Sequence, residues 1–327
     1  MTLPTITLVM PVRNEEDYLE ACLDSIVATT TSDSQLELLI YDGASTDRSR
    51  EIIGEYVGRH PWIQLLANPE RFQSWAFNRG VAAARGEFLI RLDAHTVYAP
   101  DYIAECVRLL GSSGASNVGG VQRSVGTTPV TRAIAAVVAS PFAAGDAKYR
   151  YATEPTFADT VYLGAWRTET IRRLGGMRVE WLVNEDYELN IRLREQGGTI
   201  LVSPTIQCEY AVRPGLRPLA RQYFRYGMWK IKTLWAHPRS FRWRQAIAPG
   251  FVLYLIAAAV TFRWLGPIVL GPLVLYGLGN AAASWSVIRR VGTERAYLIP
   301  VLFLLIHLSW GSGFLVGLVR FIRPRPG

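Results

Sequence analysis

Acidic residues are almost absent from the last third of this 327-residue chain. Residues 1–209 hold 19 Lys or Arg and 26 Asp or Glu, whereas residues 210–327 hold 16 Lys or Arg and one acid, Glu294. A strongly basic region is typical of proteins that contact nucleic acid or an anionic membrane surface. Contact with nucleic acid is disfavoured here, because these basic residues adjoin long uncharged apolar runs.

Cysteine is scarce as well. Cys22, Cys106 and Cys208 lie far apart and show no Cys-x-x-Cys spacing, which argues against a disulfide framework or a cysteine-based zinc site. Cys22 and Cys106 fall among apolar residues at helical intervals. We therefore expect both to be small core residues in a reducing compartment.

Charged residues are missing altogether from three C-terminal runs, 246–262, 265–288 and 296–319. The second and third exceed the roughly 18–20 residues that cross a bilayer, and the first is marginal. The alternative, buried helices of a soluble core, is disfavoured because globular helices rarely stay uncharged on every face for so long. We expect two or three spans. A third span would place Arg320, Arg323 and Arg325 on the face opposite the other arginines, against the positive-inside rule.

The start of the chain lacks the pattern of a secretory signal. Its first apolar stretch, 6–10, is short and meets charged residues at once. The acidic half is therefore expected in the cytoplasm, attached to a multi-pass protein of the inner (plasma) membrane.

Strand and helix patterns alternate over the first hundred residues, which predicts an α/β fold with a doubly wound, mostly parallel sheet. Residues 120–165 are rich in small residues and predict irregular strands around a substrate pocket. Strands are predicted at 6–10, 36–41, 63–67 and 88–92, and helices at 15–27, 45–57 (capped by Ser45 or Thr46), 75–84, 102–110 and 185–196.

Two of the apolar strands run directly into an aspartate, Asp42 and Asp93. Ligands of open α/β sheets bind at the carboxyl ends of parallel strands, so the two carboxylates are expected to share one crevice. Asp93 and His95 suit Mg²⁺ or Mn²⁺, with the remaining ligands supplied by a diphosphate and water. Asp42 is suited to accept a hydrogen bond from a base or ribose. The alternative for both segments is ordinary turn capping.

Three further segments carry candidate chemistry. The segment 11–16 follows the first strand, where a nucleotide approaches the backbone. Glu185 and Asp186 open a helix behind Asn184, and a carboxylate there is a candidate general base for an alcohol acceptor; the alternative is a plain helix start. The stretch 213–244 holds nine Lys or Arg, several aromatic residues and no acid, which predicts helices in the headgroup layer or, alternatively, a basic surface helix. Arg225 in this stretch is suited to pair with phosphate.

In their joint order these motifs resemble family 2 glycosyltransferases with the GT-A fold over about residues 4–230. The motifs are Pro11-Val12-Arg13-Asn14-Glu15, Asp42-Gly43-Ala44-Ser45-Thr46-Asp47, Asn78-Arg79-Gly80, Ala84-Arg85-Gly86, Asp93-Ala94-His95, Gly164, Gly175-Gly176 and Glu185-Asp186. The sequence 91–95 and the apolar tail are most similar to the bacterial exopolysaccharide branch of the family.

The resemblance implies a role for each matched residue. Asp42 would contact uracil, with Pro11, Val12, Glu15 and Gly164 also in the substrate site. Asp93 would lie at the diphosphate and a divalent cation, and Asp186 would be the catalytic base of an inverting transfer. Gln222, Arg225 and Tyr226 are similar to the Gln-x-x-Arg-Trp motif of processive synthases. Tyr226 replaces the Trp of that motif. The chain departs from the family in two respects: His95 replaces the second Asp of Asp-x-Asp, and two or three spans provide no polymer channel, which argues against processive synthesis.

From these observations we expect a GT-A domain over 1–209, basic interfacial helices over 210–245 and transmembrane helices over 246–327. The expected activity is transfer of a sugar, with glucose favoured, from a UDP-sugar to a hydroxyl of a polyprenyl-diphosphate-linked saccharide in exopolysaccharide or envelope glycan synthesis. The alternatives are a simple lipid acceptor (polyprenyl phosphate or diacylglycerol) and a non-catalytic sugar-nucleotide-binding membrane scaffold.

Overall fold

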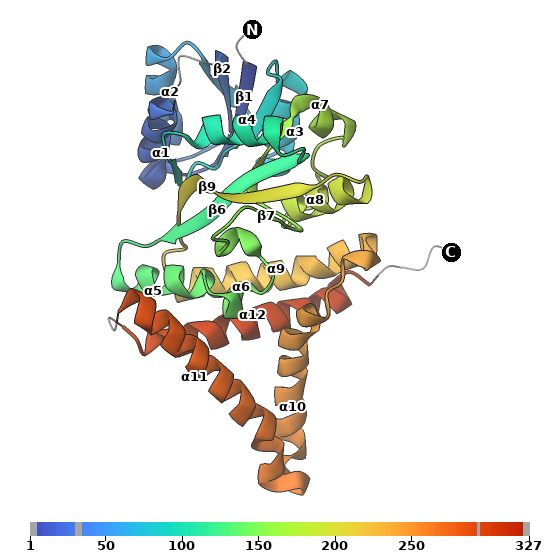
Figure 1. The fold of residues 1–327 in the computed structure, drawn as a ribbon. Coiled ribbons are helices and arrows are strands. Elements are labelled where there is room, and N and C mark those ends of the chain that lie inside the picture. The colour runs from blue at the N-terminus through green and yellow to red at the C-terminus, as the bar shows by residue number, and fades with distance from the viewer. Residues whose placement is uncertain (1–4, 30–34, 293–294, 323–327) are drawn as a thin grey trace. The chain divides into compact units, whose positions relative to one another are not determined.

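The computed structural model describes residues 5–29, 35–292 and 295–322 and divides them into two units (Figure 1). The first unit comprises residues up to 123 together with 147–211, and the second comprises 124–146 and the residues from 212 onward. Three residues of the charge analysis, Glu294, Arg323 and Arg325, lie outside the described residues.

Nine strands of the described residues form one sheet in the first unit, in the order β3-β2-β1-β4-β8-β6-β9-β5, with β7 paired to β9. The strands β1 to β4 are mutually parallel, and β8, β5 and β7 pair antiparallel with their neighbours. The strands are β1 (Thr5–Val12), β2 (Gln35–Asp42), β3 (Ile63–Ala67), β4 (Phe88–Arg91), β5 (Thr96–Tyr98), β6 (Asn117–Val125), β7 (Thr156–Phe157), β8 (Tyr162–Arg167) and β9 (Ile200–Ala211).

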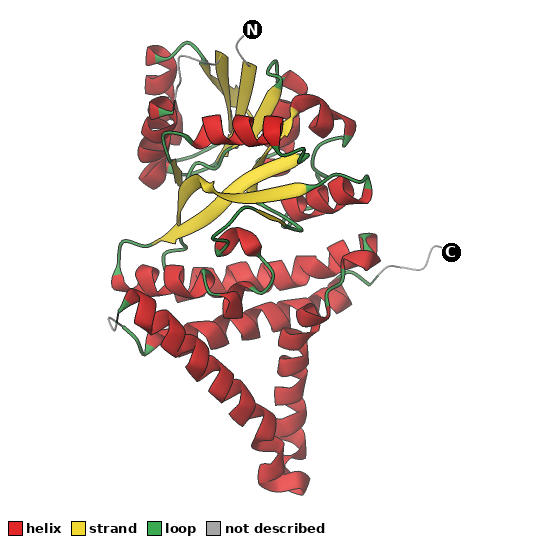
Figure 2. Cartoon of the chain, viewed as in Figure 1, coloured by secondary structure: helices red, strands yellow, loops and turns green. Residues whose placement is uncertain are grey.

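Helices cover both faces of this sheet (Figure 2). Successive side chains of a strand point to opposite faces, and β1 follows this rule: Leu8 and Met10 enter one apolar cluster and Val9 the other. The three cysteines are free and buried, so the core position expected for Cys22 and Cys106 is confirmed. The helices are α1 (Glu16–Ala28), α2 (Ser49–Arg59), α3 (Gln73–Ala83), α4 (Tyr102–Ser112), η1 (Lys148–Arg150), α7 (Thr168–Arg173) and α8 (Glu185–Glu195).

One predicted helix start is wrong. The helix α2 begins at Ser49, not at Ser45, and neither Ser45 nor Thr46 is its N-cap. The Ser45 hydroxyl instead accepts the backbone N–H of Asn14 in the loop after β1, at 3.0 Å, and the Asp47 carboxylate accepts N–H groups of both Glu16, at 3.1 Å, and Ser49, at 3.0 Å. This region is therefore a loop-to-loop connection at the edge of the sheet.

The second unit is helical in the described residues that follow β6 and β9. Its helices are α5 (Pro129–Val138), α6 (Pro141–Ala144), α9 (Leu216–Ala236), η2 (Pro238–Ser240), η3 (Trp243–Ala246), α10 (Ile247–Leu265), η4 (Gly266–Leu270), α11 (Gly271–Val291) and α12 (Leu298–Arg320). By length and composition, two apolar helical segments of the described chain are able to cross a membrane, 243–291 and 298–320.

The prediction of irregular strands throughout 120–165 is wrong for residues 129–144, which form α5 and α6. The start of α5 is built from Thr128, whose hydroxyl accepts from Thr131 N–H, and from Pro129 in the first turn. These are strong helix-start signals. The helices α5 and α6 belong to the second unit. Their apolar partners come from other parts of that unit, so the local sequence does not reveal them.

Candidate functional site

Two loops at the carboxyl ends of β1 and β2 are held together by hydrogen bonds. Ser49 Oγ accepts from Glu15 N–H at 2.8 Å, and Asn14 Oδ1 accepts from Thr46 N–H at 2.8 Å. Asn14 and Ala44 both adopt positive φ, which is uncommon for residues with a side chain and marks a constrained backbone. The two motifs that the sequence analysis placed beside a nucleoside thus form one rigid edge.

Asp42 lies at the centre of this edge and is fully buried. Its Oδ2 accepts from Arg50 Nη1 at 2.7 Å, and its Oδ1 lies 3.2 Å from Ser45 N–H. The Asp42 side chain is 0% exposed, whereas that of Arg50 is 54% exposed. Gly43 N–H also donates to Val12 O at 2.8 Å, so the parallel pairing of β1 and β2 continues to this edge, where Val12 lies opposite Asp42.

The segment after β4 joins the same edge from the other side of β1. His95 Nδ1 lies 3.3 Å from a carboxylate oxygen of Glu15, and the His95 ring packs edge-on against Tyr210. Leu92 N–H donates to Val9 O at 2.9 Å, which continues the β1–β4 pairing up to Asp93. Since β1 separates β2 from β4, Asp42 and Asp93 lie about two strand spacings apart, roughly 10 Å. The structure therefore gathers the predicted donor-side residues at one edge.

A buried arginine, Arg91, lies between acids of two of the matched motifs. Arg91, whose side chain is 5% exposed, lies 3.4 Å from Asp93 Oδ1 and 3.7 Å from Asp186 Oδ2. Its Nη2 also donates to Gln73 Oε1 at 3.3 Å, and Gln73 in turn donates through Nε2 to Glu185. The guanidinium of Arg91, the last residue of β4, thus connects Asp93 with the first turn of α8.

The three acids of this cluster differ in access to solvent. The Asp186 side chain is 38% exposed and that of Asp93 is 15% exposed, whereas Glu185 is buried. The Oε2 atom of Glu185 and the Nε and Nη1 atoms of Arg91 make no hydrogen bond within the described part of the chain. Of the two adjacent acids, Asp186 is therefore the one that a second substrate can reach.

Electrostatics separate the two acids of α8 further. Burial, and next the charge of Asp186, raise the pKa of Glu185 to about 7, against the opposing effect of Arg91. Burial lowers the pKa of the Arg91 guanidinium, but Asp93, Asp186 and Glu185 together raise it above its usual value. Arg91 therefore remains a cation, while Glu185 is partly protonated near neutral pH.

The loop that leads to α8 is fixed by residues of the other matched motifs. Asn78 clamps Met177, donating to its carbonyl and accepting from its N–H, each at 2.7 Å. Gly176 has φ +67°, and a Cβ there would lie 2.3 Å from Asn78 Oδ1. Asn184 occupies the predicted N-cap position of α8 in a left-handed conformation, although its side chain makes no capping hydrogen bond. These residues place Glu185 and Asp186.

Gly164 lies within β8 and is explained by packing. A Cβ there would come within 2.6 Å of the Trp166 ring, and its φ of +107° favours glycine. Pro11 is half-buried at the end of β1. The substrate contacts that the resemblance implies for Gly164 and Pro11 stay predictions.

The remaining candidates belong to the second unit. Gln222, Arg225 and Tyr226 lie on α9, where Gln222 Nε2 donates to Tyr226 OH at 3.0 Å and Arg225 is exposed. The phosphate contact predicted for Arg225, and the substrate contacts that the resemblance implies for Gln222 and Tyr226, stay predictions.

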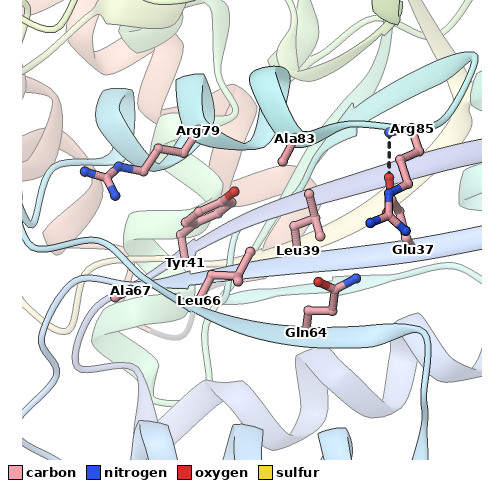
Figure 3. Close-up of a pocket in the computed structure, with 9 residues that line it drawn as sticks. All are labelled: Glu37, Leu39, Tyr41, Gln64, Leu66, Ala67, Arg79, Ala83 and Arg85. Carbon is pink, nitrogen blue, oxygen red and sulfur yellow. Dashed lines mark hydrogen bonds between the residues drawn. The ribbon is translucent and has the colours of Figure 1, made fainter.

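A separate pocket of about 340 Å³ lies beside β2, β3 and α3, away from the arginine cluster (Figure 3). Its wall carries the hydrogen bond from Arg85 N–H to Glu37 (2.8 Å), and the Arg79 guanidinium is held by Glu70 at 2.6 Å. Its lining residues are Glu37, Leu39, Tyr41, Gln64, Leu66, Ala67, Arg79, Ala83 and Arg85.

The sequence analysis gave no role to Arg91 or Gln73. An arginine that interrupts an otherwise apolar strand two residues before an aspartate is the signal that was available for Arg91. Buried arginines are almost always paired, so a partner acid could have been expected. No local pattern points to Gln73, because its partners are 18 and 112 positions away.

Comparisons with known proteins match most of the chain. The model of Glycosyl transferase family 2 matches residues 7–162, and that of Glycosyl transferase family group 2 matches residues 88–316. The succinoglycan biosynthesis protein ExoA of Rhizobium meliloti is 30% identical over 99% of this chain and 98% of its own length. The dolichyl N-acetyl-α-D-glucosaminyl phosphate 3-β-D-2,3-diacetamido-2,3-dideoxy-β-D-glucuronosyltransferase of Methanococcus voltae is 25% identical over 96% of this chain and 97% of its own length.

A solved structure has the same fold. The mannosyltransferase PcManGT from Pyrobaculum calidifontis, in complex with GDP-Man and Mn²⁺, aligns with a TM-score of 0.62 over 98% of this chain and 89% of its own, at 19% identity. The predicted fold class is thereby confirmed, as is the prediction that the chain is an enzyme. The matches to the family models and to a full-length relative show that this chain belongs to glycosyltransferase family 2.

Proposed function

We propose that this glycosyltransferase moves one sugar, with glucose favoured, from a UDP-sugar to a hydroxyl of a polyprenyl-diphosphate-linked saccharide, with inversion at the anomeric carbon. The observation that carries the proposal is the exposed Asp186 carboxylate held by Arg91, the same residue that holds Asp93 at the end of β4. One cation thus connects an acid on the donor side with an acid open to an acceptor.

On the donor side, the edge built from the loops after β1 and β2 would bind the nucleoside. The Oδ2 atom of Asp42 accepts a hydrogen bond from Arg50, and its Oδ1 atom lies 3.2 Å from Ser45 N–H. An N–H group of the nucleotide base would therefore donate to Oδ1, alongside Ser45. Val12 ends the neighbouring strand β1, and Glu15 lies in the loop that follows it. Because the carboxylate is buried and fixed, its direction is set before the donor binds.

A divalent cation, Mg²⁺ or Mn²⁺, fits beside Asp93, whose carboxylate is partly exposed and is the kind of oxygen ligand these ions prefer. When bound, the cation would neutralise charge that develops on the diphosphate leaving group. The described residues hold no group of three or more His, Cys, Asp or Glu able to bind a metal, so most ligands would come from the diphosphate and water. His95, although close, already has Glu15 beside its Nδ1.

On the acceptor side, Asp186 would take the proton of the attacking hydroxyl. Its Oδ1 accepts from Tyr187 N–H at 2.7 Å, and its Oδ2 faces Arg91 at 3.7 Å. Both contacts fix the carboxylate while more than a third of the side chain stays exposed. A base that is oriented and accessible is what removal of an alcohol proton requires.

The names of the relatives support a lipid-carried saccharide as the acceptor and exopolysaccharide synthesis as the process. The Methanococcus voltae relative is named as a transferase to a sugar carried on dolichyl phosphate, and the Rhizobium meliloti relative as a protein of exopolysaccharide synthesis. The apolar segments 243–291 and 298–320 support a location at the membrane. We place the protein at the inner (plasma) membrane as a multi-pass protein with its sheet-containing unit in the cytoplasm, where nucleotide sugars are made available.

Donor specificity, acceptor class and metal dependence can be tested together. Purified protein in lipid nanodiscs would be incubated with UDP-glucose, other UDP-sugars or GDP-mannose, and with a polyprenyl-diphosphate saccharide, polyprenyl phosphate or diacylglycerol. We expect radiolabel in the lipid fraction with a UDP-sugar and the diphosphate-linked saccharide, at least tenfold above other pairs, and its loss with EDTA and recovery with Mn²⁺. Transfer from GDP-mannose alone, or to polyprenyl phosphate alone, would overturn the assignment.

A further inference from the structure

The three apolar helices of the second unit have very different surroundings. The helix α12 runs beside α9 and also packs against α5, α10 and α11, and its residues Ile299, Leu302, Phe303 and Ile306 are buried. The far halves of α10 and α11 are exposed and apolar, up to 78% at Ile268 in η4 between them. Figure 1 shows α10 and α11 extending away from α9 and α12. Protein contacts therefore account for one face of α12, whose other face keeps exposed apolar residues such as Val301 and Val319, but for little of the α10–α11 hairpin.

The helices α9 and α12 are joined backbone to backbone. A Cβ at Gly313 would lie 2.0 Å from Phe224 O, and one at Gly317 would lie 2.5 Å from Met228 O. The partner positions advance by four residues in both helices, so α9 and α12 run in the same direction. A Cβ at Gly227 would likewise lie 2.0 Å from Trp310 O. Contacts this close fix α12 to the orientation of α9.

The helix α9 cannot cross a bilayer. It carries five cations along its 21 residues and no acid, and each would cost about 2.5–3.5 kcal/mol near the bilayer centre. They are Arg217, Arg221, Arg225, Lys230 and Lys232. An aromatic, basic helix of this kind is suited to the headgroup layer, with its three exposed arginines near anionic lipids.

From these observations we infer that α12 lies along the cytoplasmic surface of the membrane beside α9, and that, among the described helices, only the α10–α11 hairpin crosses the membrane. This inference rests on the membrane location in the proposed function. The hairpin has the required length: α10 has 19 residues and α11 has 21, or about 28 and 31 Å, against a hydrocarbon core of about 30 Å.

The distribution of arginine fits this arrangement. Arg263 lies near the tip of the hairpin, where a side chain would reach the opposite headgroups. Every other arginine from residue 237 to residue 322 is then on the cytoplasmic side, as the positive-inside rule expects. These are Arg239, Arg242, Arg244, Arg289, Arg290, Arg295 and Arg320. A spanning α12 would instead carry Arg320 to the far side.

Single cysteines at the ends of these helices test the inference. The native cysteines are buried, so they give little background. Tyr297→Cys and Ile322→Cys flank α12, and Ile268→Cys marks the tip of the hairpin; all three side chains are exposed. A membrane-impermeant maleimide would be applied to right-side-out spheroplasts and to inside-out vesicles of a bacterial host, with transfer activity measured to show that each variant folds.

We expect Tyr297→Cys and Ile322→Cys to react at least tenfold faster in inside-out vesicles, and Ile268→Cys at least tenfold faster in spheroplasts. Ile322→Cys reacting from the outside, or reacting only after detergent is added, would overturn the placement of α12 and leave the proposed reaction intact. Reaction of Ile268→Cys from the cytoplasmic side would show that the hairpin does not cross the membrane, and would also overturn the proposed multi-pass topology.

Discussion

Two charged pairs in the first unit are built in opposite ways. At the end of β2 the acid is buried and the cation is exposed, because Asp42 is 0% exposed and its partner Arg50 is 54% exposed. At the end of β4 the cation is buried and one of its partner acids is reachable, because Arg91 is 5% exposed and Asp186 is 38% exposed. The first arrangement fixes one carboxylate in place. The second keeps a carboxylate oriented while it stays open to a substrate.

The difference matters because charges in low-dielectric surroundings need partners. Removing one member of a buried ion pair typically costs about 3–5 kcal/mol, whereas an exposed partner contributes about 1 kcal/mol or less. The β4 cluster should therefore be sensitive to loss of its cation, and the β2 pair to loss of its acid. Each substitution below tests one half of this contrast.

The largest effect is expected for Asp186→Asn. The amide keeps the size of the side chain but cannot take a proton, so kcat should fall about 10³-fold with little change in the donor KM. Steady-state transfer by purified protein measures both constants, and Asp17→Asn, an exposed acid on α1, is the matched control. A variant that retains a tenth of wild-type kcat would remove Asp186 from the base role.

Next in size is Arg91→Met, which leaves Asp93, Asp186 and Glu185 close together without their shared cation. We expect kcat to fall about 10²-fold and the protein to lose about 3 kcal/mol of stability. Arg91→Lys should recover stability more than activity, because an ammonium group lacks the planar fork. Thermal unfolding and transfer assays would be compared with Arg173→Met, an exposed arginine on α7. Equal effects of the two methionine substitutions would contradict the special role of Arg91.

The parts of this site that depend on local sequence were predictable. The end of β2 at Asp42 and the start of α8 at Glu185 follow from hydrophobic period and turn residues, and the structure has both, whereas β4 ends at Arg91, two residues before Asp93. The partners of Arg91 were not predictable, because they come from α3 and α8 and depend on tertiary contacts. The predicted start of α2 was wrong for the same reason, because Ser45 Oγ accepts from Asn14 N–H and Asp47 Oδ2 accepts from Glu16 N–H. Side-chain oxygens near a helix start do not reveal which backbone N–H they will meet.

A pH-dependent effect should appear with Glu185→Gln. The folded-state pKa of Glu185 is raised to about 7 from the usual value of 4.5, so the folded state binds this proton more tightly than the unfolded state does. The wild type therefore loses stability as pH rises from 4.5 to 7, by roughly 3 kcal/mol, and the loss is absent below 4.5. Glu185→Gln should not show this loss, so its stability relative to wild type should increase with pH over that window.

Thermal unfolding of the purified protein between pH 4.5 and 8 measures this difference. Glu169→Gln, an exposed acid on α7, is the control and should follow the wild type at every pH. Parallel curves for wild type and Glu185→Gln would mean that the Glu185 carboxyl titrates like an exposed one.

The smallest effects belong to the β2 pair. Asp42→Asn should raise the KM for the UDP-sugar about tenfold, because the charge that orients the base and the Ser45 turn is lost. It should leave kcat nearly unchanged, because Asp42 lies far from the reacting atoms. Arg50→Ala should change the same KM only about twofold, since Arg50 is exposed and its contribution is screened by solvent and salt. Measuring both KM values at low and high salt separates the two members of the pair. If Arg50→Ala were as damaging as Asp42→Asn, the exposed cation would itself contact the donor, and the contrast with the Arg91 cluster would fail.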